Sequence, residues 1–417
     1  MTPLSQSTTT VEPTVPAQTL LGLFRRFLGF GLLAWGGPIA QIAMLRRELV
    51  DTERWISSDR FNRTLAVYQA LPGPEAHELC VYFGYLARGR VGGFLAGLGF
   101  MLPGLTLMLL LSWLYVSVGL QSPMTLAFFA GAQAAVLALI VRGTHRIGRH
   151  AVTDRWLATT ALLAAAAAIA GAHFVIILGA AGMSYLSASR GRTPLAAGLL
   201  AGLVVVSGLT VVARYADNDS VGRTPAQVDT NTQLAAATAG ELLASGLKAG
   251  LLTFGGAYTA IPFLQSDIEQ GGWMTRETFL DGVALGGILP APLIIFSTFV
   301  GYVAGGLPGA VAITAGVFFP AFAITLVGHR QLERLVQHAP MHAVLDGITA
   351  GVVGLVAATA VALAPTALGS VAGALIFAAS LSALYAWRSG LAVPVAIIGA
   401  GAAGVLLFGV LQQGAAS

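Results

Sequence analysis

The sequence predicts an all-α, polytopic transmembrane protein of about 13 spans, whose two homologous halves form an inverted repeat with broken helices. Three observations predict this class. Of the 417 residues, 56% are hydrophobic and only 10% charged, with a mean hydropathy of +0.79, which is too little charge to cover a soluble surface. Apolar stretches of about 18–25 residues, long enough to cross a membrane, recur along the chain. Glycines and prolines interrupt these stretches at matching places in the two halves.

The chain divides into four parts. Residues 1–18 are rich in Ser, Thr and Pro and lack the apolar core of a cleaved signal peptide, so we expect a disordered cytoplasmic tail. Residues 19–213 and 238–411 are the predicted N-terminal and C-terminal repeats. Between them, residues 214–237 form a polar linker whose change in composition marks the boundary.

Hydropathy places the spans within both repeats. In the first repeat they are expected near 20–44, 61–87, 91–118, 124–142, 156–172, 174–189 and 194–213. In the second repeat they are expected near 238–264, 278–303, 307–327, 341–363, 367–387 and 391–411. The spans that contain glycine and proline breaks leave half-helices or re-entrant segments as alternatives.

The internal repeat is an ordered series of matched residues. Gly36 and Gly37 align with Gly255 and Gly256, and Trp55 and Phe61 align with Trp273 and Phe279. Further along, Pro72 and Pro74 align with Pro290 and Pro292, and Gly84 and Tyr85 align with Gly301 and Tyr302. One such match could arise by chance in a glycine-rich chain, but a series in the same order indicates two copies of one unit.

The arginines predict which side of the membrane each connector faces. Uncharged connectors at 119–123 and 172–174 are expected outside, and those around Arg146 and Arg190 in the cytoplasm. This alternation places the N-terminus inside, the C-terminus outside, and a further set of basic residues inside: His329, Arg330, Arg334 and Arg388. Residues 45–63, with five arginines and four acids, would then lie outside, unless they lie on the membrane surface or the first broken span does not fully cross.

The breaks predict an anion site near the middle of the membrane. Glycine and proline inside an apolar helix free backbone groups, which are tolerated only against protein or a wet cavity. A half-helix that begins at a break directs its N-terminal amides and positive dipole end into that cavity. The alternative is that the breaks only kink helices for packing. The residues assigned to substrate binding at the breaks are Gly36, Gly37, Pro38, Pro72, Gly73, Pro74, Gly255, Gly256, Pro290 and Pro292.

Glu75, His77 and Glu78 follow the second break directly, within a predicted span. Ionisable side chains at membrane depth are costly and usually face the interior of a bundle. A histidine titrates near neutral pH, so these three residues are candidates for coupling or gating. The alternative is that the break brings them to a solvated interface. The second repeat has Ile294, Ile295 and Phe296 in this region, so such a role would be asymmetric.

Three other polar residues are candidates. Lys248 is a lone cation in an apolar stretch shortly before Gly255, and either binds an anion or extends to the membrane surface. Gln41, one turn after Pro38, either donates to an oxyanion or makes a hydrogen bond between helices. Arg46 could attract the anion or gate the site, with a topological or surface role as the alternative.

Several classes of function are poorly supported. The chain has one cysteine, Cys80, so neither a disulfide framework nor a cysteine metal cluster is expected. No phosphate-binding Gly-x4-Gly-Lys-[Ser/Thr] motif is present, and Val81 stands where a His-Glu-x-x-His zinc site needs its second histidine. We therefore expect no metal, no cofactor, no nucleic acid and no enzymatic activity.

Several motifs of this chain resemble those of the chromate ion transporter family in its two-domain form. They are Gly36-Gly37-Pro38, Trp55-Ile56, Leu71-Pro72-Gly73-Pro74, Gly84-Tyr85 and Thr253-Phe254-Gly255-Gly256-Ala257-Tyr258. The resemblance covers roughly residues 20–390. It implies an inner-membrane efflux carrier that binds chromate, confers chromate resistance, and is driven by the membrane potential or the proton gradient. The second copy has Ala257 and Ala291 in place of a proline and a glycine, which indicates unequal roles for the two halves.

Other readings stay open at this point. Sulfate has nearly the same size and charge as chromate, so a carrier for sulfate or another oxyanion is the first alternative. A membrane enzyme or a sensor is a more distant one. Besides the anion, the expected partner is membrane lipid, and a homodimer is left open.

Overall fold

The computed structural model describes residues 15–118, 122–220, 235–328, 339–387 and 389–414. Some parts of the chain that carry predictions therefore lie outside the described residues. They are residues 1–14 of the predicted tail, most of the linker, and His329, Arg330, Arg334 and Arg388. In the first half the helices are α1 (Leu20–Leu32), α2 (Gly37–Leu45), the π-helix η1 (Arg46–Thr52), α3 (Ser58–Ala70), α4 (Glu75–Val118), α5 (Pro123–Ala151), α6 (Arg155–Ile169), α7 (Phe174–Ser189) and α8 (Thr193–Ser220).

The second half has the same kinds of element. Its helices are α9 (Ala239–Leu251), the 3₁₀ helix η2 (Ala257–Ala260), α10 (Ile261–Gly271), α11 (Arg276–Gly287), the 3₁₀ helix η3 (Leu293–Ile295), α12 (Phe296–Val327), α14 (Ala339–Ala367), α15 (Val371–Ala386) and α16 (Ala392–Gly414). The described residues contain no strand, so the all-α class is confirmed.

Five helical segments of the described chain are long and apolar enough to cross a membrane: Glu75–Val118, Pro123–Ala151, Thr193–Ala213, Leu293–Val327 and Pro340–Ala367. The helices α6, α7, α15 and the apolar part of α16 are shorter. The predicted count of about 13 spans is not confirmed, because four of the predicted spans are not single crossings.

In each of the predicted spans 20–44 and 61–87, the chain breaks between two helical segments that fold back on one another; in the second, the returning segment is the part of α4 before Arg88. Arg26 in the middle of α1 forms an ion pair with Glu53, which follows η1. Arg60 at the start of α3 donates from Nε to the Tyr82 hydroxyl of α4 over 3.1 Å. Neither contact could form if the chain continued straight on after the break.

The predicted spans 238–264 and 278–303 fold back in the same way. Lys248 of α9 pairs with Asp267 of α10, and the rings of Phe279 in α11 and Phe296 in α12 lie 5.7 Å apart. The four predicted crossings are thus corrected to four helical hairpins. A hydropathy profile cannot distinguish the two arrangements, because both bury the same apolar residues.

The hairpin geometry brings part of the charged segment 45–63 back beside α1. After η1 the chain reaches Glu53, which pairs with Arg26 of α1. Which side of the membrane this segment faces stays a prediction.

The two repeats share a second irregularity. In α4 the helix is interrupted at Arg88 (φ −147°, ψ 31°) and Gly89 (φ 61°, ψ −153°). In α12 it is interrupted at Gly305 (φ −147°, ψ 20°) and Gly306 (φ 63°, ψ −158°). Positive φ at the second position favours glycine. Near-identical dihedrals at aligned positions show that the repeat extends to backbone geometry.

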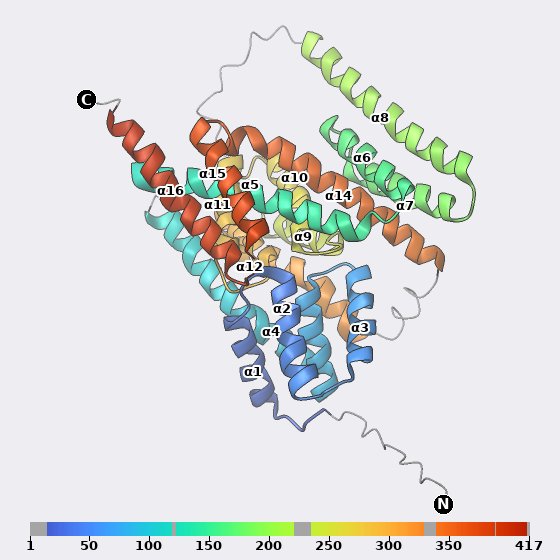
Figure 1. Ribbon diagram of the computed structural model, residues 1–417, viewed down its shortest axis with the longest axis vertical. Coiled ribbons are helices and arrows are strands. Elements are labelled where there is room, and N and C mark those ends of the chain that lie inside the picture. The colour runs from blue at the N-terminus through green and yellow to red at the C-terminus, as the bar shows by residue number, and fades with distance from the viewer. Residues whose placement is uncertain (1–14, 119–121, 221–234, 329–338, 388, 415–417) are drawn as a thin grey trace, which may run out of the picture.

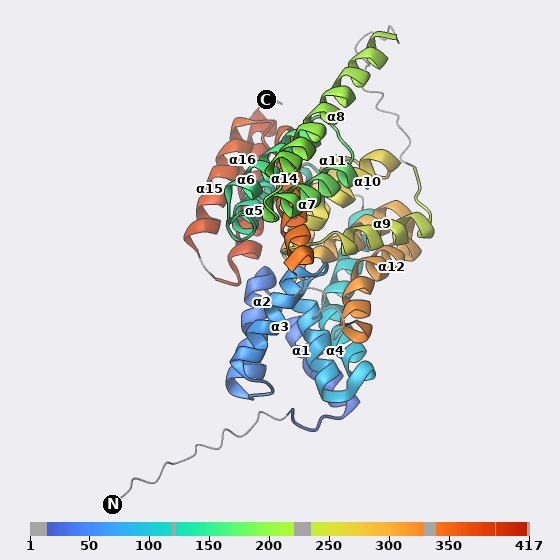
Figure 2. The ribbon, with the colours of Figure 1, turned by 90° about the vertical axis from the view of Figure 1, so that its right-hand side faces the viewer.

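The hairpins of the two halves meet at their tips, which are the non-helical residues 33–36, 71–74, 252–256 and 288–292. The Gly73 amide of the second tip donates to the Thr253 carbonyl of the third over 2.8 Å. Figures 1 and 2 show α1 to α3 in the lower part of the molecule and α9 and α10 above them. The halves therefore insert their tips toward each other, as expected of inverted repeats.

Candidate functional site

A cavity of about 320 Å³ lies where three of the four breaks come together. It is lined by Pro38 at the start of α2, Glu75 at the start of α4, and Gly255 and Gly256 of the third tip. The C-terminal end of α5 and the N-terminal end of α14 form the remaining walls. The sequence therefore predicted several of the lining residues, although these come from distant parts of the chain.

Two helices that begin at this cavity, α2 and η2, have no side-chain cap, as is also true of η1, α10, η3 and α12. Several other helices do have a side-chain cap, in which the residue before the helix accepts a hydrogen bond from its first turn. These residues include Thr19, Ser57, Ser122, Asp154 and Thr238. By contrast, α2 and η2 begin after Gly36 and Gly256 without any side-chain cap. No side-chain oxygen accepts from their first amides, and amides in this position favour an anion.

Arg146 of α5 provides positive charge inside the cavity. It is absent from the ion pairs formed among the described residues. Glu75, which lines the same cavity, is close enough to interact with it electrostatically. A guanidinium without a bonded carboxylate can form two parallel hydrogen bonds with an oxyanion.

Tyr258 and two histidines complete the polar wall. The Tyr258 ring packs against Gly143 of α5, and its hydroxyl faces Gly37. His342 of α14 lies 3.0 Å from Asp346, measured from Nδ1 to Oδ2, and His150 of α5 lies on the same wall. The cavity therefore holds donors on several sides, which suits a tetrahedral oxyanion.

Glu78 and His77 follow Glu75 on α4 but do not line the cavity. Both side chains are fully buried, and neither carboxylate oxygen of Glu78 has a hydrogen-bond partner among the described residues. The Glu78 carboxylate rests against Gly73, where a Cβ would come within 2.7 Å of Oε1. The His77 ring lies between Phe318 and Phe322, with centroids 4.9 and 4.7 Å away.

Gln41 and Arg46 also lie outside the cavity lining. Gln41 is buried, and its Nε2 donates to the Ala34 carbonyl over 2.9 Å, which satisfies one of the groups freed by the first break. The Arg46 guanidinium stacks over the Phe61 ring, 5.8 Å from its centroid, and lies 3.7 Å from Asp51. Arg46 is therefore near the base of its hairpin.

Lys248 lines a separate surface hollow that includes no residue of the four tips. Its ammonium forms an ion pair with Asp267, whose other oxygen accepts a hydrogen bond from Ser245. The same ammonium lies 5.2 Å from the centroid of the Phe174 ring. These contacts neutralise the lysine and hold α9 against α10.

The fourth tip is the one that does not reach the cavity. Pro290 and Pro292 are buried, and Ala291 packs against Gly104 of α4. Of the second tip, Gly73 contributes its backbone bond to Thr253, and Glu75 immediately beyond the tip reaches the cavity. The two repeats therefore contribute unequally.

The main residue that sequence reasoning missed is Arg146, together with Tyr258, His150, His342 and Asp346. Arg142, Arg146 and His150 recur every fourth residue, which places them on one face of a helix. This spacing can be read from the sequence. We attributed the basic residues to membrane topology instead, because positive charge at the cytoplasmic end of a span is expected.

Comparison with known proteins identifies relatives along the whole chain. The family model described as "Chromate transporter" matches residues 21–186 and again residues 240–405. The "Chromate transport protein" of Pseudomonas aeruginosa is 54% identical over 410 residues, covering 97% of each chain. A protein of the same description from Cupriavidus metallidurans is 27% identical over 96% of each chain. The "Probable chromate transport protein" of Synechococcus elongatus is 28% identical over 94% of this chain and 97% of its own. No solved structure matches.

Proposed function

The chain belongs to the chromate transporter family, and from this premise we propose that it exports chromate across the bacterial inner membrane and so confers chromate resistance. Membership in this family makes the protein a transporter, not an enzyme. The substrate follows from the descriptions of three relatives that align along nearly the whole chain. We propose alternating access around the cavity at the hairpin tips as the mechanism.

The cavity is the observation that carries this proposal. Chromate is a tetrahedral dianion, and the cavity offers Arg146 together with the uncapped starts of α2 and η2. Helix N-termini and guanidinium groups are the usual ligands of such anions in proteins. The Lys248–Asp267 pair is assigned to holding one hairpin together, and Glu75 and Glu78 to coupling or gating.

The membrane potential alone could drive export. Each charge that crosses 100 mV gains about 2.3 kcal/mol, so a dianion leaving a negative cytoplasm gains about 4.6 kcal/mol. This corresponds to a concentration ratio on the order of 10³. A proton gradient would then adjust the rate or add to the gradient, and is not required for export.

The cavity opens toward the cytoplasm in this proposal. Arg142, Arg146 and Arg149 cluster at the end of α5 that borders the cavity, and loops rich in arginine remain in the cytoplasm. The same rule places the N-terminus inside and the C-terminus outside.

Uptake by purified protein in liposomes tests the function. A potassium diffusion potential, positive inside, should drive chromate into the vesicles, and empty liposomes should show none. Sulfate added in equal amount distinguishes the first alternative: it should compete weakly if the carrier is selective for chromate. Absence of chromate uptake with normal sulfate uptake would replace chromate by sulfate as the substrate.

We expect Glu75→Gln protein to keep uptake driven by the potential but to lose any stimulation by an imposed pH gradient. Glu75 lines the cavity and forms no ion pair within the described residues, so it can exchange a proton as the anion binds. The matched control is Glu277→Gln, an exposed carboxylate outside the cavity. If the pH gradient stimulates Glu75→Gln as strongly as the unaltered protein, Glu75 is not the coupling group.

A further inference from the structure

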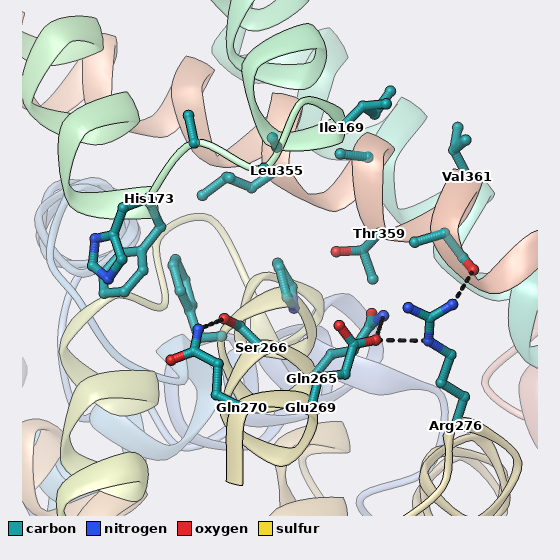
Figure 3. Close-up of a pocket in the computed structure, with 18 residues that line it drawn as sticks. Ile169, His173, Gln265, Ser266, Glu269, Gln270, Arg276, Leu355, Thr359 and Val361 are labelled. Carbon is teal, nitrogen blue, oxygen red and sulfur yellow. Dashed lines mark hydrogen bonds and ion pairs between the residues drawn. The ribbon is translucent and has the colours of Figure 1, made fainter. Parts of the chain in front are cut away.

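A second and larger hollow, of about 630 Å³, lies along α10. It is lined by the turn between α6 and α7, by α10, by Arg276 at the start of α11, and by the C-terminal half of α14 (Figure 3). Neither the tips nor any of the candidate residues lines it. Its position at the uncharged turn 172–174 places it, in the proposed topology, on the outer side of the membrane.

The hollow and the cavity lie along the same two elements. Tyr258 of η2 lines the cavity, and Pro262, four residues later, lines the hollow. On α14, Thr349 lines the cavity and Leu355 the hollow, about 9 Å apart along the helix axis. Both elements therefore border both spaces.

The residues between the two sets include the fully buried, apolar Ala260, Ile261 and Val352. Thr259, also fully buried, donates its hydroxyl to the Gly256 carbonyl. These apolar residues belong to one buried cluster, in the region where η2 and α10 contact α14, and they form a short apolar barrier. A barrier of this kind, between two polar spaces on a common wall, is what a carrier needs if it opens to one side at a time.

The polar groups of the hollow resemble those of the cavity. Arg276 donates from Nε to Glu269 over 2.7 Å, and Gln265 donates from Nε2 to the same carboxylate oxygen over 2.9 Å (Figure 3). Gln265 is buried, and its Oε1 has no hydrogen-bond partner within the described chain. Both spaces thus contain a guanidinium, but the cavity has two carboxylates, Glu75 and Asp346, whereas the hollow has one, Glu269, which is bonded to its guanidinium.

We propose that this hollow is the outward vestibule of the transport path, in which Arg276 binds a divalent tetrahedral oxyanion in place of Glu269. The proposal rests on the proposed transport function and adds the exit site. The incoming anion replaces the carboxylate on the guanidinium, and Glu269 limits how tightly the anion is held, which favours release. The shared wall of η2–α10 and α14 is the element that moves.

Single-cysteine labelling tests the proposal, because the only native cysteine, Cys80, is fully buried. Ser266→Cys introduces a near-isosteric thiol in the hollow, and Thr349→Cys introduces one in the cavity. A membrane-impermeant maleimide should label Ser266→Cys in intact cells and Thr349→Cys only in inverted vesicles. Gln270→Cys, exposed in the same hollow, is the second reporter if Ser266→Cys folds poorly. The reverse pattern of labelling would overturn the assignment.

Protection by external sulfate tests the binding residue, since sulfate, unlike chromate, does not oxidise thiols. Sulfate should slow labelling of Ser266→Cys. Adding Arg276→Gln should raise the protecting concentration by about tenfold or more. Adding Glu269→Gln should lower it by about threefold, because a partly exposed partner competes weakly.

Two outcomes separate this proposal from the function itself. Labelling without protection, in a protein that still takes up chromate in liposomes, rejects the vestibule site and leaves the transport function intact. Protection abolished by Arg276→Gln, in a protein that carries no chromate, supports the site and rejects chromate transport.

Discussion

Arg146→Gln is expected to reduce chromate uptake by about tenfold to a hundredfold. A hydrogen bond to a charged group contributes about 1.5–3 kcal/mol, and Arg146 provides the guanidinium of the cavity. Glutamine keeps donors and much of the side-chain length, so the loss reports the charge. The measurement is the initial rate of uptake in liposomes that contain equal amounts of inserted protein.

Arg149→Gln is the matched control for this prediction. Arg149 lies one turn further along α5, is exposed, and does not line the cavity. It should retain most of the uptake. Equal rates of uptake in both variants would place the anion away from α5 and would make Lys248 the next candidate for its binding residue.

Gly36→Ala is expected to lower the free energy of unfolding by about 2–5 kcal/mol. Gly36 has φ +88°, and a Cβ there would lie 2.5 Å from the Gly390 carbonyl oxygen, at the connection between α15 and α16. The left-handed backbone costs a non-glycine residue about 1–2 kcal/mol, and overpacking against backbone adds about 1–3 kcal/mol. Thermal unfolding in detergent, followed by circular dichroism, measures the loss.

Gly37→Ala separates the two causes. Gly37 also has positive φ (+76°), but the nearest atom to its Cβ would be the Tyr258 hydroxyl at 3.9 Å. It should therefore show the backbone cost alone, about 1–2 kcal/mol. If both variants are equally stable, the first tip does not pack closely against Gly390.

The breaks show what the sequence could predict. Paired glycines and prolines inside apolar stretches are visible without a structure, and their alignment between halves predicted both the repeat and the place of the cavity. Pro38, Glu75, Gly255 and Gly256 do line it. The direction of the chain after each break was not predictable, since a crossing and a hairpin have the same hydropathy.

The charged residues show where sequence reasoning ended. Lys248 stood alone in an apolar stretch, but Asp267, its partner, is adjacent only because α10 folds back along α9. Arg146 was attributed to membrane topology, although it also faces the cavity. In both cases the deciding contact joins segments that only the hairpin fold brings together.

The most direct test of the cavity at the hairpin tips is to locate the bound anion. Crystals grown with chromate should show a chromium anomalous peak within hydrogen-bonding distance of Arg146 and close to Gly255 and Gly256. A peak beside Lys248 and Asp267, with the cavity free of chromium, would contradict the account.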